Sequence, residues 1–144
     1  MTLKEQNAIK RAAYKEAMHY MKEAKVLMKK APKDDGYDDF IKYKRDLNKI
    51  CKTAYSGMSV ALDAYLKLAN AASISKRNRS NVYYMKDFLR KMDIDISTDL
   101  YSAHNLLLWM CCDYGMTGTR VIEMGFENVM NIINKIKPHQ GAAI

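Results

Sequence analysis

The feature that most constrains this chain is a helical repeat of apolar residues between Tyr37 and Asn70. At 100° per residue these side chains fall on one continuous face, and charged side chains occupy the opposite one. The repeat predicts a helix of roughly thirty residues and about 45 Å, which needs other helices packed along its length. The residues of this apolar face are Phe40, Tyr43, Leu47, Ile50, Cys51, Ala54, Met58, Ala61, Leu62, Tyr65, Leu68 and Ala69.

Four further helical repeats follow from the same reasoning, at residues 3–31, 81–92, 99–114 and 117–137. Only two prolines and six glycines interrupt the chain, and the alternation typical of strands is absent. We therefore predict an all-α fold, a single antiparallel bundle of five helices, two long and three shorter. It should pack around the helices at 37–70 and 99–114. The bundle is expected to span residues 1–137, and residues 138–144 are expected to form a flexible tail.

The connections between these helices differ in length. Pro32 and the polar residues 33–36 predict a tight turn, which makes the first two helices antiparallel neighbours. Residues 71–81 are polar and basic and form the longest connection. Residues 97–99 are all good N-cap types for the fourth helix, and Gly115 is expected to close it.

Composition points to a cytoplasmic protein. The chain is 49% hydrophobic and 28% charged, which is ordinary for one globular domain. Its N-terminus has no apolar signal core, and no run of about eighteen apolar residues could span a membrane. An odd number of cysteines, two of them adjacent, does not suit a secreted disulfide scaffold, so we expect core packing for Cys51, Cys111 and Cys112.

No pattern of residues predicts catalysis, a cofactor or a metal site. His104 lies two helical turns from the cysteine pair, too far to share one metal ion, so a hydrogen-bonded buried histidine is the simpler interpretation. Paired carboxylates occur only in expected loops and caps, and no glycine-rich phosphate loop is present. We expect no enzyme. The least favoured alternative is an RNase of unrecognised arrangement that uses His104.

Positive charge is concentrated in the first part of the chain and suggests an acidic partner. Of the formal charge of +8, residues 1–52 contribute 14 basic against 8 acidic side chains, whereas residues 100–144 contribute 3 against 3. Nucleic acid is the usual partner of such a surface. The strongest local signal is a basic loop, where Tyr83 and Tyr84 could stack on unpaired bases next to Lys76, Arg77 and Arg79.

A second basic surface follows one side of the first helix. Its cations lie within about 80° of arc on the helical projection, and the acidic residues of this helix lie on another side. We call this row the helix-one stripe; it comprises Lys4, Arg11, Lys15, Lys22, Lys25 and Lys29. Arg11, Lys15 and Lys22 are the residues that we expect to extend a nucleic-acid surface from the basic loop.

The fourth helix predicts self-association. It is apolar nearly all round between Leu106 and Cys112, so it is either central in the bundle or covered by a second copy of the chain. A tryptophan among leucines is typical of interface anchors. We expect Leu106, Trp109 and Met110 to form the contact of a homodimer.

The opening hairpin consists of Ala12–Ala31 and the segment DLNKICKTAYSGMSVALDAYLKL, Asp46–Leu68, which together make up about half of the chain. This hairpin resembles that of the HEPN-like helical bundles, nucleotide-binding proteins of higher eukaryotes and prokaryotes. It also looks like small uncharacterised helical proteins of Bacteroidetes. The resemblance implies a bundle of four or five helices that is often dimeric and that in many members cleaves RNA. A neighbouring nucleotidyltransferase is an expected partner in that family.

The catalytic motif of the resembled family is absent. Active members carry an Arg, four to six intervening residues and a His near the last helix. Here thirteen residues separate Arg90 from His104, and eighteen separate Arg120 from His139. The resemblance therefore implies a non-catalytic member. The leading expectation is a non-enzymatic, self-associating interaction protein, and the alternative is an RNA-binding module.

Overall fold

The computed structural model describes residues 1–34, 37–70, 74–115 and 118–138, and the side chains of Tyr37, Asp38 and Lys76 also lie outside the described set. The described chain is mainly helical and carries one short hairpin, so the predicted all-α class is confirmed. Its elements in order are α1 (Leu3–Lys30), β1 (Lys33–Asp34), β2 (Tyr37–Ile41), α2 (Lys44–Leu68), α3 (Lys76–Arg79), α4 (Val82–Arg90), α5 (Ile94–Ala103), the π-helix η1 (His104–Asp113) and α6 (Thr119–Lys135).

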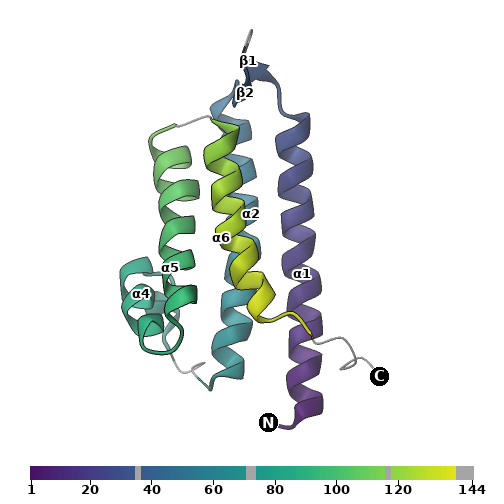
Figure 1. Ribbon diagram of the computed structural model, residues 1–144, viewed down its shortest axis with the longest axis vertical. Helices are drawn as coiled ribbons and strands as arrows, with labels where there is room; N and C mark the ends of the chain where they lie inside the picture. Colours follow the sequence, from purple (N-terminus) through teal and green to yellow (C-terminus); the bar gives the residue numbers. More distant parts are fainter. Residues whose placement is uncertain (35–36, 71–73, 116–117, 139–144) are drawn as a thin grey trace.

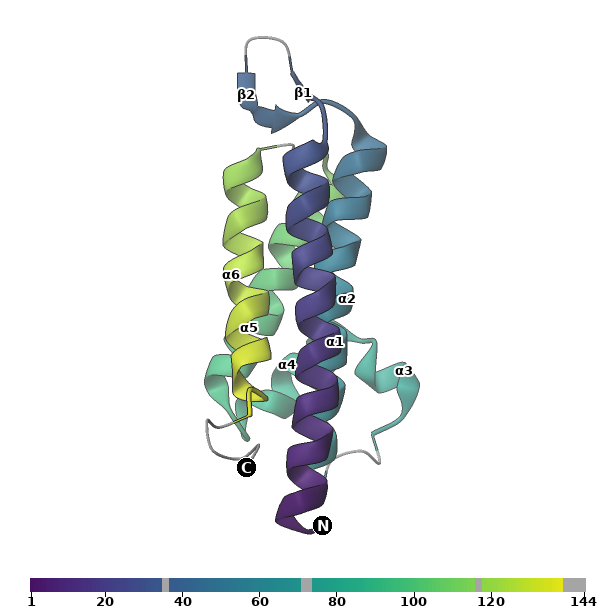
Figure 2. The same ribbon diagram turned by 90° about the vertical axis from the view of Figure 1, so that its right-hand side faces the viewer.

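The long helices stand side by side as upright columns of one bundle (Figure 1). They are α1, α2, α6 and the continuous rod of α5 and η1, while α4 lies beside the lower end of that rod. The predicted antiparallel packing of the first two helices is confirmed. The turned view places α1 in front, with α6 on one side of it and α2 on the other (Figure 2). α1 packs along α2 but touches α6 only sparingly, so one side of the bundle is loosely closed.

The central helix is α2, as the sequence predicted. It packs against α1, α6 and η1. Its buried residues are Leu47, Ile50, Cys51, Ala54, Gly57, Met58, Ala61, Leu62, Ala64 and Leu66. Burying this face removes a large apolar area from water, which is the main stabilising contribution in a bundle of this kind.

The predicted start of the long helix is wrong. Residues 37–41 pair with β1 in an antiparallel hairpin, and α2 begins only at Lys44. Ile41 is fully buried, while Phe40 forms a bridge to Gly118, which directly precedes α6. The backbone N–H of Lys42 donates to the Pro32 carbonyl at 2.9 Å. The backbone N–H and C=O groups of this segment thus form hydrogen bonds to other segments of the chain, whereas the helical repeat predicted hydrogen bonds within a helix. Residues 35–36 of the predicted turn lie outside the described residues.

The predicted fourth helix is wrong at its start and in its second half. It begins at Ile94, because the Asp93 carboxylate accepts hydrogen bonds from the N–H groups of Asp95 and Ile96 at 3.0 and 3.3 Å. Residues 97–99 therefore lie inside α5, where the Ser97 hydroxyl donates to the Lys86 carbonyl at 2.7 Å. From His104 the rod continues as a π-helix, in which backbone hydrogen bonds join residues five apart. A nearly uniform apolar segment does not distinguish this pattern from an α-helix.

The helix number also differs from the prediction. The described residues form six α-helices and the π-helix instead of five helices, because α3 forms within the predicted loop at 71–81 and α5 separates from η1. Residues 71–73 of that loop lie outside the described residues, as do residues 139–144 of the predicted tail. The Gly115 stop is confirmed, since this residue ends the rod with φ +68°. None of the described helices is long and apolar enough to cross a membrane.

Candidate interaction surfaces

The predicted self-association residues lie on η1, and the chain itself covers them to different extents. Trp109 is 49% exposed, and Leu106 and Met110 are partly exposed. The indole packs edge-on against Tyr114, with ring centroids 4.8 Å apart, and Tyr114 is itself exposed. The buried side of η1 consists of Leu107, Cys111 and Cys112. The helix is therefore sided, with an apolar outer edge that faces solvent in the single chain.

The basic loop is only partly available for binding a ligand. Arg77 is exposed on α3, but the guanidinium of Arg79 forms an ion pair with Asp63 of α2 at 3.7 Å. The Arg79 Nε atom is buried without a hydrogen-bond partner. The side chain of Lys76 lies outside the described residues. The structure thus assigns Arg79 a contact that ties α3 to α2, in addition to any contact with a phosphate.

The helix-one stripe is exposed along α1. The side chains of Arg11, Lys15 and Lys22 are all solvent-accessible. Lys15 and Lys22 also flank a shallow depression of about 470 Å³ whose other lining residues are Tyr14, Met18 and His19. The stripe therefore combines cations with two aromatic rings on one helix face.

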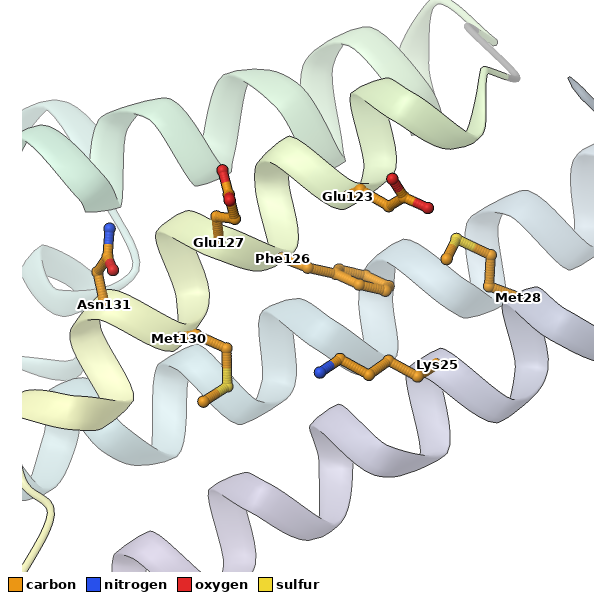
Figure 3. Close-up of a pocket in the computed structure, with 7 residues that line it drawn as sticks. All are labelled: Lys25, Met28, Glu123, Phe126, Glu127, Met130 and Asn131. Atoms are coloured by element: carbon orange, nitrogen blue, oxygen red, sulfur yellow. The ribbon is translucent and has the colours of Figure 1, made fainter. Parts of the chain in front are cut away.

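A groove between α1 and α6 was not predicted from the sequence. It has a volume of about 560 Å³ and lies where the two helices diverge (Figure 3). Its apolar lining comes from Met28 of α1 and from Phe126 and Met130 of α6. Figure 3 shows the Phe126 ring pointing toward α1 and the Lys25 side chain extending across the opening. An apolar floor open to solvent makes this groove a candidate docking site.

The two walls of the groove carry opposite charge. Lys25 belongs to the helix-one stripe and lies on the α1 side, whereas Glu123 and Glu127 lie on the outer side of α6. All three side chains are exposed, and none forms an ion pair within the described part of the chain. The sequence analysis identified the basic row on α1 but no acidic edge on α6, and only the fold shows that the two are neighbours.

The three cysteines meet in the core between α2 and η1. All are free thiols, and Cys51 and Cys111 are fully buried. A hydrogen bond with the Cys111 thiol and burial together raise the pKa of Cys51, and burial raises the pKa of Cys112. The same hydrogen bond lowers the pKa of Cys111. Cys51 and Cys112 are therefore held in the protonated form, which is a poor nucleophile and metal ligand. The predicted core role is consistent with this arrangement, although the sequence did not predict that Cys51 would join the pair.

His104 lies near Tyr55 rather than in a cleft. The two ring centroids are 6.2 Å apart in an edge-on contact, and the His104 Nδ1 atom is buried without a hydrogen-bond partner. Burial raises the pKa of Tyr55 to about 12, so this phenol is neutral at physiological pH. His104 lines neither the α1–α6 groove nor the depression on α1. The RNase alternative therefore gains no support from its position.

The described residues contain no group of three or more His, Cys, Asp or Glu side chains placed to hold a metal ion. An acidic depression between α5 and α6 includes Asp95 and Asp99. Its Asp99 carboxylate accepts hydrogen bonds from the side-chain amides of Asn128 and Asn131 at 2.9 and 3.2 Å. This carboxylate thus has a structural role in joining the two helices.

Comparisons with known proteins agree with the fold and give no activity. A model of the family described as domain of unknown function DUF5618 matches residues 12–138. A solved structure of a protein of unknown function from Dyadobacter fermentans superposes with a TM-score of 0.73 and 26% sequence identity. That match covers 88% of this chain and 94% of the other. None of the curated proteins compared with the chain matches it.

Proposed function

This chain belongs to the DUF5618 family, and we propose that it is a non-enzymatic interaction protein that associates with itself. The contact is the outer edge of η1, formed by Leu106, Trp109 and Met110, with a homodimer as the basic unit. A π-helix is rare and occurs often at functional sites, which supports a role for this segment beyond packing.

The observation that carries the proposal is the position of Trp109. Nearly half of this residue is exposed, whereas Leu107, Cys111 and Cys112 of the same helix are buried. Tyr114 contacts the indole edge-on, which favours one orientation of the Trp109 side chain and so lowers the entropy lost on association. Large aromatic side chains held in this way are typical centres of protein interfaces.

Light scattering of the wild type at tens of micromolar tests this proposal. We expect a mass above one copy, and Trp109→Gln should weaken the η1 contact by roughly thirtyfold or more, as for an interface centre. The matched control is Ile94→Gln, which removes another exposed apolar side chain, 60% accessible, from the same rod. A wild-type mass of one copy, or equal behaviour of the two variants, would contradict the proposal.

RNA binding is the second candidate function, and the helix-one stripe supports it better than the basic loop. On α1, Lys15 and Lys22 flank a depression lined by Tyr14 and His19, which suits phosphates next to unpaired bases. Replacing Arg11, Lys15 and Lys22 with alanine should weaken binding of a single-stranded RNA oligomer. It should also reduce the slope of log K against log salt concentration by up to about three. Replacing Lys76, Arg77 and Arg79 tests the loop. Binding that neither triple variant changes would refute this candidate.

The relationship to HEPN-like bundles belongs to the same proposal. It rests on the α1–α2 hairpin and would make this chain a non-catalytic member, located in the cytoplasm and encoded near a nucleotidyltransferase partner. Copurification of the chain with the product of such a neighbouring gene tests the partner, and the absence of any such gene would remove this part of the proposal.

A further inference from the structure

We infer that the α1–α6 groove is a second contact between copies of this chain, in which two grooves face each other across a two-fold axis parallel to the bundle. The inference rests on the proposed self-association and adds a separate surface to it. None of Leu106, Trp109 and Met110 lines the groove. The occupant is a second copy because the groove carries both members of a complementary charge pair on its own walls.

The apolar part of the groove needs a partner. α1 and α6 separate here, so Met28 and Met130 remain partly exposed above the buried Phe126 ring. When two grooves face each other, the partly exposed Met28 and Met130 side chains of the two copies lie opposite one another across the interface, and methionine side chains adapt to the shape they meet.

The charges determine which two-fold arrangement is allowed. Lys25 and Glu127 both line the groove, Lys25 from α1 and Glu127 from the outer side of α6, where its carboxylate points away from α1 in the single copy (Figure 3). A two-fold axis parallel to the helices exchanges the walls, so that each α1 faces the α6 of the other copy at the same height. Lys25 then meets Glu127 twice per pair. An axis perpendicular to the helices and lying in the interface would instead place α1 against α1, and the helix-one stripes would repel each other.

The charges of the groove also argue against an unrelated acidic protein as the occupant. An acidic helix would satisfy Lys25 and the neighbouring stripe but would place like charges next to Glu123 and Glu127. A second copy satisfies both walls at once, because its own α6 is acidic and its own α1 is basic over this stretch. The self-complementary pattern is what an isologous contact requires.

Charge exchange in the Trp109→Gln background tests the groove with the η1 contact removed. We expect this variant to remain a pair of copies at tens of micromolar. Lys25→Glu should weaken the pair about tenfold, as should Glu127→Lys, because each change replaces two attractions with two repulsions. The double change K25E/E127K should return the affinity to within about threefold, since the attraction is restored with its direction reversed.

Three controls separate the outcomes. Lys91→Glu makes the same change of charge on an exposed side chain after α4 and should leave the pair intact. Met130→Gln should weaken the pair without altering its salt dependence. Circular dichroism should show unchanged helix content, because the substituted side chains are exposed or only partly buried.

The results have distinct consequences. If Trp109→Gln is a single copy while the wild type is a dimer, the groove contact is wrong and the proposed function stands. If the wild type is a single copy, both are wrong. If either charge reversal has no effect in the Trp109→Gln background, or if the double variant does not recover affinity, the two-fold arrangement is refuted.

Discussion

Gly125 lies in the middle of α6 at its closest approach to η1, and replacing it with alanine should destabilise the protein. A Cβ atom at this position would lie 2.5 Å from Cδ2 and 2.6 Å from Cγ of Leu107. Both distances are far below van der Waals contact. Leu107 is fully buried, so it cannot turn into solvent and must shift within the packed core. The glycine thus permits the spacing that holds η1 against α6.

Two opposing terms set the magnitude. Alanine is the better helix former by about 1 kcal/mol in a helix interior. Forcing an extra carbon into a packed core costs about 1–3 kcal/mol. The expected result of Gly125→Ala is therefore a loss of about 1 kcal/mol in the free energy of unfolding, or roughly 3 °C in Tm for a domain of this size.

The effect of Gly125→Ala on stability should change sign when Leu107 is also replaced by alanine, which makes the reasoning testable. Leu107→Ala alone should cost about 2–5 kcal/mol through the cavity that it leaves. Adding Gly125→Ala should then recover about 1 kcal/mol, since the clash has gone and the gain in helix propensity remains. Urea denaturation of the four proteins of this cycle measures both effects.

Gly115→Ala serves as the control for this cycle. Its φ of +68° strains an alanine, but a Cβ there would meet no atom within 4 Å. It should cost about 1 kcal/mol in both backgrounds, through backbone strain alone. The explanation of Gly125 by contact with Leu107 would be refuted if Gly125→Ala stabilised the wild type or had the same effect in both backgrounds.

Three further predictions follow from local interactions. Asn81→Ala should lower the free energy of unfolding, measured by urea denaturation, by about 1 kcal/mol. The side-chain oxygen Oδ1 of Asn81 accepts hydrogen bonds from two N–H groups at the start of α4, at 3.0 and 3.1 Å, and alanine removes this cap. Burial opposes ionisation of Asp93, but hydrogen bonds from Lys135 and the backbone outweigh it and lower its pKa. This stabilisation is present above about pH 4 and is lost as the pH falls through the lowered pKa, so Asp93→Asn should flatten the acid side of the stability curve. The three cysteine thiols should react with a thiol reagent only after unfolding; rapid labelling of the native protein would contradict their burial.

How much could be predicted from the sequence depended on how local the determining interactions are. The bounds of α1, α4 and α6 follow closely from apolar periodicity and from caps supplied by adjacent residues, such as Asn81 for α4. The start of α2 did not, because Phe40 continues the helical apolar face although it lies in a strand, and the helical repeat does not include Ile41, which is the buried residue of that strand. Pairing with β1 and Gly118, a contact across more than seventy residues, decided between helix and strand.

The candidate surfaces divide in the same way. The sequence alone identified the exposed cations of the helix-one stripe and the apolar segment around Trp109, since each lies within one helix. It could not identify the α1–α6 groove, because Lys25 and Glu127 are about a hundred residues apart and become neighbours only through packing. It also could not show that Arg79 reaches Asp63.

The sequence by itself determined that this chain folds into packed helices, because an apolar side on each helix must leave water whatever its partner is. Only the tertiary structure decided which helix sides find a partner and which remain open. That outcome depends on the angles and spacing between helices, where a single small residue such as Gly125 brings two of them together, while α1 and α6 are left apart.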